Sequence, residues 1–118
     1  MIGRTEEQAR KLIEDAKRFR RLGAFAIVIE MVPPASVAKA VTESIKIPTI
    51  CIGAGPPHCD GQILVIHDVL GLTERPPSFA KKYVDLASII RDAVAKYVSE
   101  VRSGGEFPSA EYYKDIKS

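Results

Sequence analysis

A single carboxylate ends an apolar segment near the start of the chain. Glu30 follows directly after Phe25-Ala26-Ile27-Val28-Ile29. Desolvation next to such a segment favours the protonated acid and suits a carboxylate to proton transfer. The same position also suits an ion pair with a lysine or arginine at the rim of a sheet. The residues alone leave a general base and a paired surface carboxylate as equal alternatives for Glu30.

Two glycines follow a second apolar segment. Thr49-Ile50-Cys51-Ile52 leads directly into Gly53-Ala54-Gly55. Glycines let backbone N–H groups approach an anion closely, and they equally permit a tight turn. Gly53 and Gly55 are therefore candidate substrate-binding residues, with a purely structural turn as the alternative.

Side chains of metal-ligand type are concentrated between residues 58 and 68. They are His58, Cys59, Asp60, His67 and Asp68. Their spacing matches no zinc template, and adjacent residues of a strand point in opposite directions. The alternative to a metal site is a polar loop followed by hydrogen-bonded residues at a strand end.

Cysteine usage gives no sign of a disulfide framework. The chain has two cysteines, Cys51 and Cys59, and no secretory leader opens it. Two free thiols are the expectation for such a chain. The roles of these cysteines and of His58 stay open.

The periodicity of apolar residues predicts the elements that would position these groups. Thr5 and Gln8 form a capping-box pattern, and apolar residues then recur at helical spacing as far as Gly23, a natural helix stop. The pattern predicts helices over 5–22, 35–46 and 79–103, strands over 25–30, 49–53 and 62–67, and a tail over 104–118.

The alternation of helices with wholly apolar strands is typical of an α/β fold with a parallel sheet. We therefore expect residues 1–118 to form one domain with three parallel strands, whose carboxyl ends carry the site. A parallel sheet this small exposes apolar edges, which indicates a part of a larger structure or a partner that covers them.

Composition and charge narrow the function classes. The 118 residues carry a net charge of +2, 7% aromatic residues and no tryptophan, which argues against a nucleic-acid binder. Apolar runs reach only five or six residues, as in Phe25–Ile29, too few to cross a membrane. With no leader, we expect a cytoplasmic protein.

Several segments, in the right order, resemble one enzyme family, ketopantoate hydroxymethyltransferase. They are Gly23–Pro33 with Glu30 in an E-x-V-P motif, Ile47–Ile50, Ile52–Gly55, Asp60–Val65 with its D-G-Q motif, His67-Asp68, Leu70–Leu72, and Val101–Ser103 through Glu106–Pro108. The resemblance runs from Gly3 to Pro108. The E-x-V-P and D-G-Q motifs together argue against a related barrel of the phosphoenolpyruvate mutase and isocitrate lyase group.

The resemblance implies a (β/α)₈ barrel enzyme of pantothenate biosynthesis. The family transfers a hydroxymethyl group from 5,10-methylenetetrahydrofolate to the α-keto acid 3-methyl-2-oxobutanoate, giving 2-dehydropantoate, and uses Mg²⁺ to hold the keto acid. The family's proton acceptor falls on Glu30. The interpretation of Glu30 as a base agrees with this role, because proton removal beside a carbonyl needs a positioned base.

The chain also departs from the family pattern. A complete barrel needs about 250 residues, and the likeness is to the carboxyl-terminal part alone. The family's metal ligands and substrate lysine have no counterpart here, so we expect no metal-binding residue on this chain and no activity from the chain alone. A homo-oligomer, or a chain that supplies the amino-terminal half barrel, would complete it. A non-catalytic truncated or assembly module is the alternative. Cys51 stands where the family usually has glycine.

Overall fold

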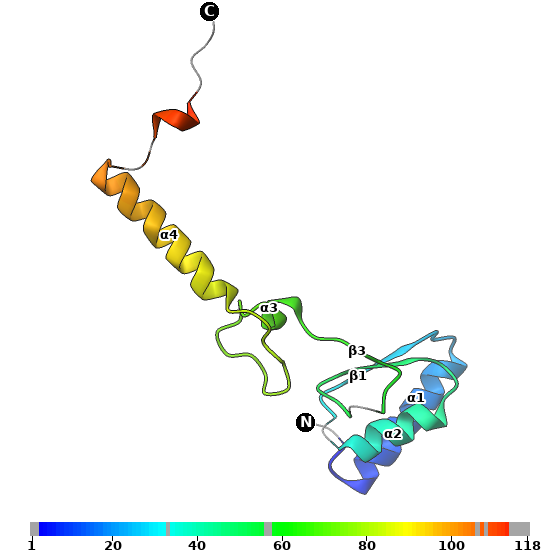
Figure 1. The fold of residues 1–118 in the computed structure, drawn as a ribbon. Helices are drawn as coiled ribbons and strands as arrows, with labels where there is room; N and C mark the ends of the chain where they lie inside the picture. Colours follow the sequence, from blue (N-terminus) through cyan, green and yellow to red (C-terminus); the bar gives the residue numbers. More distant parts are fainter. Residues whose placement is uncertain (1–2, 33, 56–57, 106, 108, 114–118) are drawn as a thin grey trace, which may run out of the picture. The chain divides into compact units, whose positions relative to one another are not determined.

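The computed structural model describes residues 3–32, 34–55, 58–105, 107 and 109–113 (Figure 1). The motif residues Pro33, Glu106 and Pro108 and the loop residues 56–57 lie outside this part of the chain, as do tail residues 114–118. The chain divides into two compact units, one of Met1–Val65 with Pro77–Ala80 and one of Ile66–Pro76 with Lys81–Ser118. We describe each by itself, and the single partial-barrel domain stays a prediction.

The first unit contains a parallel sheet of three strands, in the order β1-β2-β3 (Figure 1). The strands are β1 (Ile27–Glu30), β2 (Thr49–Ile52) and β3 (Gly61–Gln62). β1 pairs with β2 from Ile27↔Thr49 to Glu30↔Ile52, and β2 pairs with β3 from Ile50↔Gly61 to Cys51↔Gln62. The predicted α/β class with parallel strands is confirmed.

Two helices lie side by side in this unit (Figure 1). α1 (Glu6–Arg21) begins after Thr5, whose hydroxyl accepts a hydrogen bond from the Gln8 N–H at 3.2 Å, as the capping-box pattern predicts. α2 (Ala35–Ser44) connects β1 to β2. The core is formed by small and branched side chains of α1, α2, β1 and β2 and of the segments that follow β1, α2 and β2: Ala16, Ile29, Val32, Val37, Ala38, Val41, Ile45, Cys51 and Ala54.

Side chains alternate across β1, and only one face of this strand is buried. Ile29 belongs to the core, whereas Val28 and Glu30 are exposed. We expected both faces to be covered, because the strand is apolar throughout. Within this unit the helices cover one face of β1, and the other face, which we expected to be buried as well, is exposed.

The predicted strand over 62–67 is wrong for most of its length. After Gln62 one further bond joins the Ile63 N–H to the Cys51 carbonyl at 3.0 Å, and the chain then forms α3 (Ile66–Val69). β2 has only four residues, so a longer β3 would have no strand to pair with. A short apolar run is compatible with a strand and with a helix, so periodicity could not distinguish the two for residues 62–67.

The second unit contains α3, α4 (Leu86–Ser103) and a 3₁₀ turn (Ala110–Tyr112). The predicted helix over 79–103 begins seven residues late, because the segment before Leu86 makes other backbone bonds. The Tyr83 N–H donates to the Val69 carbonyl at 2.9 Å and the Leu86 N–H to the Leu70 carbonyl at 3.0 Å. α4 ends at Gly104, whose left-handed backbone (φ 64°) is a common helix cap.

Candidate active site at the carboxyl end of the sheet

The strand register brings Glu30 to the same end of the sheet as the glycine segment. Glu30 is the register partner of Ile52, and Gly53 follows directly. The Met31 N–H donates to the Ile52 carbonyl at 3.0 Å, and Met31 then turns the chain with a left-handed backbone (φ 54°). Such a conformation is uncommon away from glycine and ends β1 sharply. Glu30 and Gly53 therefore lie where parallel sheets build their sites.

Glu30 is exposed within this chain. Its side chain lies on the opposite side of β1 from Ile29, away from the buried core. Among the described residues it forms no ion pair, so the paired surface carboxylate is not what the structure shows. The Glu30 carboxylate is also not buried in this chain, although we expected the preceding apolar run to desolvate it. The Glu30 carboxylate is therefore accessible to a molecule that binds at this end of the sheet.

A groove of about 250 Å³ borders β1 and α1. Its charged lining side chains are two carboxylates, Asp15 and Glu30, and the other lining residues are apolar: Leu12, Ala16, Phe19, Ile27, Val28, Ile29, Val32 and Val41. The groove contains residues from both faces of β1, so it follows the edge of that strand.

The candidate glycines are required by packing. Gly53 (φ 59°) lies against Phe79, and a Cβ at this position would come within 2.6 Å of the phenyl ring. Gly55 (φ 29°) lies against α2, where a Cβ would collide with the Ala38 side chain. These contacts explain both glycines structurally. A role in substrate binding stays a prediction.

The candidate metal ligands are not brought together. Cys59 forms a disulfide with Cys51, and the Asp60 carboxylate accepts a hydrogen bond from Thr49. His67 and Asp68 lie on α3 in the other unit. Within the described ranges no three His, Cys, Asp or Glu side chains form a group that could hold a metal ion. The donor set around Glu30 therefore does not fit Mg²⁺, and we derive no step through a metal on this chain.

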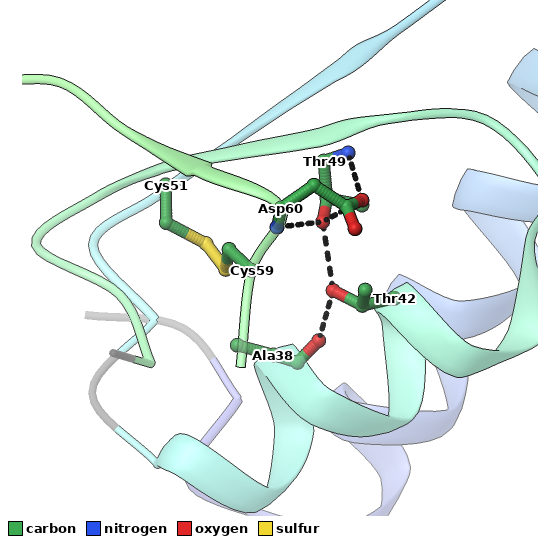
Figure 2. Close-up of a disulfide and its surroundings, with 6 residues drawn as sticks. All are labelled: Ala38, Thr42, Thr49, Cys51, Cys59 and Asp60. Carbon is green, nitrogen blue, oxygen red and sulfur yellow. Dashed lines mark hydrogen bonds between the residues drawn. A yellow bond between two sulfur atoms is a disulfide. The ribbon is translucent and has the colours of Figure 1, made fainter. Parts of the chain in front are cut away.

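The expectation of two free thiols is wrong. A disulfide joins Cys51 of β2 to Cys59, with their Cα atoms 6.0 Å apart (Figure 2). Cys51 is fully buried and Cys59 packs against the same core. Two cysteines eight residues apart gave no signal for this pairing, because only the return of the chain from β2 to β3 brings them together.

A polar cluster beside the disulfide was also missed. The Asp60 carboxylate accepts hydrogen bonds from the Thr49 N–H at 2.9 Å and the Thr49 hydroxyl at 3.2 Å, and the Asp60 N–H donates to that hydroxyl oxygen at 3.3 Å (Figure 2). The Thr42 hydroxyl of α2 lies 2.8 Å from the Thr49 hydroxyl. The D-G-Q motif contains Asp60, but nothing in its spacing indicated Thr49 as the partner.

Comparison with known proteins identifies the family. The sequence profile of the ketopantoate hydroxymethyltransferase family matches residues 1–110, so the chain belongs to this family. Similar proteins include the 3-methyl-2-oxobutanoate hydroxymethyltransferases of Pyrobaculum aerophilum (66% identity over 98% of this chain and 43% of the relative), Caldivirga maquilingensis (68%, over 98% and 42%) and Sulfurisphaera tokodaii (56%, over 100% and 43%).

This chain spans about 43% of the length of such relatives and corresponds to their carboxyl-terminal part. Among the described residues no helix is both long and apolar enough to cross a membrane.

Proposed function

We propose that this chain contributes the general base to a 3-methyl-2-oxobutanoate hydroxymethyltransferase built as a (β/α)₈ barrel. The observation that carries the proposal is the position of Glu30. It ends β1 in register with Ile52, one residue before Gly53, in a chain that matches the family over residues 1–110. Family membership supports pantothenate biosynthesis as the setting and the cytoplasm as the compartment.

The chemistry assigned to Glu30 is proton removal beside a carbonyl. One carboxylate oxygen accepts the proton from C3 of 3-methyl-2-oxobutanoate, and the C–H electron pair passes into an enolate. Water releases the one-carbon unit of 5,10-methylenetetrahydrofolate as formaldehyde, which breaks both of its C–N bonds and leaves tetrahydrofolate. C3 then forms a bond to the formaldehyde carbon, and the resulting alkoxide takes back a proton from the Glu30 carboxyl group to give 2-dehydropantoate. A carboxylate positioned in this way typically contributes about 10²–10⁴-fold to such a step.

The groups that neutralise the enolate must come from elsewhere. Among the described residues Glu30 belongs to no group of three metal-ligand side chains, and the groove is lined by no cationic side chain. The family's Mg²⁺ would therefore be held by the other part of the barrel. A chain carrying the amino-terminal half barrel would supply that part, whereas a homo-oligomer would add only further copies of the same residues. The purified 118-residue chain alone is expected to form no 2-dehydropantoate.

The test is reconstitution with a supplied amino-terminal half. We would co-express the chain with the part of the Pyrobaculum aerophilum relative that precedes its match and assay 2-dehydropantoate formation with Mg²⁺ and methylenetetrahydrofolate. Glu30→Gln should lower kcat at least 100-fold. The exposed Glu7 on α1 provides the matched control, and Glu7→Gln should leave kcat within twofold. Near-normal turnover of the Glu30→Gln complex would exclude this carboxylate as the base.

A second function is a non-catalytic module of the same fold. The exposure of Glu30 and the absence of a three-residue metal-ligand group among the described residues favour it. It predicts a reconstituted complex that assembles but does not turn over, even with the wild-type chain. Turnover that depends on Glu30 would reject it.

A further inference from the structure

The disulfide joins β2 to the segment that returns toward β3. Cys51 is the third residue of β2 and is fully buried, and Cys59 is half-buried against the same core. Their Cα atoms are 6.0 Å apart, a usual separation for bonded cysteines (Figure 2). The bond therefore ties a residue of the sheet to a segment that lies outside the sheet.

Cys51 is also connected to the candidate active site through its neighbour in the chain. Ile52 follows Cys51 directly and is the register partner of Glu30. The Ile52 carbonyl accepts a hydrogen bond from the N–H of Met31, at 3.0 Å, and Met31 is the residue after Glu30. The backbone position of Glu30 therefore depends on Ile52, which is covalently bonded to one half of the disulfide.

The return segment from β2 to β3 has further ties at both of its ends. Near β2, Ala54 is buried and the His58 N–H donates to the Gly55 carbonyl at 2.9 Å. Next to β3, the Asp60 carboxylate accepts a hydrogen bond from Thr49, the first residue of β2. Opening the disulfide would leave the pair of Asp60 and Thr49 in place. The start of β2 should therefore stay fixed, while the segment that follows its carboxyl end loses a covalent tie.

Reduction should also leave the core in place. A buried cysteine thiol behaves as a small apolar group, so Cys51 can stay at its present position after the bond has opened. Cys59 is the half-buried partner and is therefore the sulfur that a reductant reaches first. The expected effect of reduction is a local release next to Gly53 and Glu30, without loss of the fold.

We propose that the Cys51–Cys59 disulfide positions Glu30 and Gly53 for catalysis, and that a dithiol reductant lowers the activity by opening this bond. The inference rests on the proposed function and adds a form of regulation to the same site. A displacement of about 1 Å in an active site can lower a rate about 100-fold. A small release of the segment after β2 is therefore sufficient for a large effect.

The redox step is an ordinary thiol–disulfide exchange. One thiolate of the dithiol attacks the Cys59 sulfur, the Cys51–Cys59 bond breaks, and the Cys51 sulfur leaves and takes up a proton. The second thiol of the reductant then displaces the Cys59 sulfur, which takes up a proton in turn. The protein gains two electrons and two protons, and the reductant becomes a disulfide. A small disulfide oxidant reverses the step.

NMR relaxation of the full chain alone tests the structural part of the proposal. Amide order parameters are measured with the disulfide intact and after reduction with dithiothreitol. Those of His58 and Met31 should fall from about 0.85, the value of rigid backbone, to below about 0.6. The order parameter of Ile27, whose N–H donates to the Pro48 carbonyl at the other end of β1, should stay near about 0.85.

Two outcomes of this measurement would overturn the proposal. Unchanged order parameters at His58 and Met31 would show that the disulfide does not hold this end of the sheet. An equal fall at Ile27, or an unfolded spectrum after reduction, would show that the bond stabilises the whole unit and does not act on the site in particular.

A double variant provides the matched control. Cys51→Ala/Cys59→Ala removes both sulfurs and should give the order parameters of the reduced chain, whether or not dithiothreitol is present. The same order parameters as in the oxidised wild-type chain would contradict the proposal, because the segment would then be held without the bond.

The activity part is tested on the complex reconstituted with the upstream part of the Pyrobaculum aerophilum relative. Reduction with dithiothreitol should lower kcat at least about tenfold, in line with a displaced catalytic group, and reoxidation should restore it. The complex of the double variant should have the lowered kcat from the start and should not respond to dithiothreitol. This control excludes an effect of the reductant on the upstream part. Full activity of the reduced complex would overturn the proposal.

The two proposals fail in different ways. If the oxidised complex does not turn over, the proposed function is wrong, and the order parameters decide whether the disulfide holds this end of the sheet. If only the present inference is wrong, the complex turns over equally well with the disulfide intact and with the disulfide reduced.

Discussion

The Asp60 carboxylate accepts a hydrogen bond from the backbone N–H of Thr49, eleven residues earlier in the chain, at 2.9 Å. Thr49 is fully buried at the first position of β2, and Asp60 directly precedes β3. The bond therefore fixes the start of one strand to the start of its parallel neighbour. Parallel strands usually need a dozen or more residues between them, and here residues 53–60 suffice.

Asp60→Ala should destabilise the first unit by about 1–3 kcal/mol, because the buried Thr49 N–H loses its acceptor. Asp60→Asn keeps one acceptor oxygen and should cost less. The free energy of unfolding, taken from urea titrations, measures both effects. Asp92→Ala, at an exposed position on α4, is the control and should stay within about 0.5 kcal/mol of wild type. A fully stable Asp60→Ala chain would show that water replaces the carboxylate.

The Cys51–Cys59 disulfide also fixes the segment that leads from β2 to β3, because Cys59 directly precedes Asp60. Closing so short a loop removes entropy from the unfolded chain and stabilises the fold by about 2–3 kcal/mol. We expect dithiothreitol to lower the urea midpoint of the wild-type chain and to leave a Cys51→Ala/Cys59→Ala double variant unchanged. Two reactive thiols in the denatured, unreduced protein would contradict the bond itself.

The elements that could be predicted from the sequence are those that are defined by their own residues and immediate neighbours. α1 carries its own cap at Thr5 and its own stop near Gly23, and β1 and β2 are compact apolar runs with turn residues on both sides. The elements after β2 are defined by contacts with other segments of the chain, which periodicity does not show. Residues 62–67 could extend the sheet only if β2 were longer. The backbone N–H groups of Tyr83 and Leu86 donate hydrogen bonds to the carbonyls of Val69 and Leu70, at the end of α3, and no periodicity shows these contacts.

The candidate site was predictable in the same limited sense. The end of an apolar run located Glu30, and the register confirmed that Gly53 lies at the same end of the sheet. The exposure of Glu30 could not be inferred from the apolar run, because it depends on which face of β1 the helices cover. The disulfide and the Thr49–Asp60 pair both join residues that only the return from β2 to β3 brings together.

Asp85 gives a prediction for the pH dependence of α4. The Ser88 hydroxyl donates to its carboxylate at 2.9 Å, and this bond is the main reason that the pKa of Asp85 lies below its ordinary 3.8. A lowered pKa means that the contact stabilises the helix start above about pH 3.8, and that this contribution is lost as pH falls through the lowered value.

Ser88→Ala should raise the pKa of Asp85 toward its ordinary value, and carboxyl-carbon NMR titration measures the shift. Ser99→Ala, on the same helix and exposed, should leave the titration of Asp85 unchanged. An identical curve in the Ser88→Ala chain would assign the lowered pKa to the remaining influences, the Lys82 and Arg91 charges among them.

A comparison of alanine substitutions at Gly55 and Gly23 distinguishes the cost of backbone strain from the cost of close packing. Both have a positive φ, 29° and 96°, but a Cβ at Gly55 would meet Ala38 of α2, whereas a Cβ at Gly23 would meet nothing within 4 Å. Gly23→Ala should therefore cost about 1–2 kcal/mol, the penalty of a left-handed backbone alone. Gly55→Ala should cost about 1–3 kcal/mol more, because α2 has to shift.

Urea unfolding of the two glycine variants measures this difference. Because Gly55 lies in the segment that follows β2, the shift in its variant should also disturb the end of the sheet where Glu30 is positioned. The reconstituted enzyme should then lose more activity with Gly55→Ala than with Gly23→Ala. Equal free energies of unfolding for the two variants would mean that α2 yields without cost, and that Gly55 is free for another role such as substrate binding.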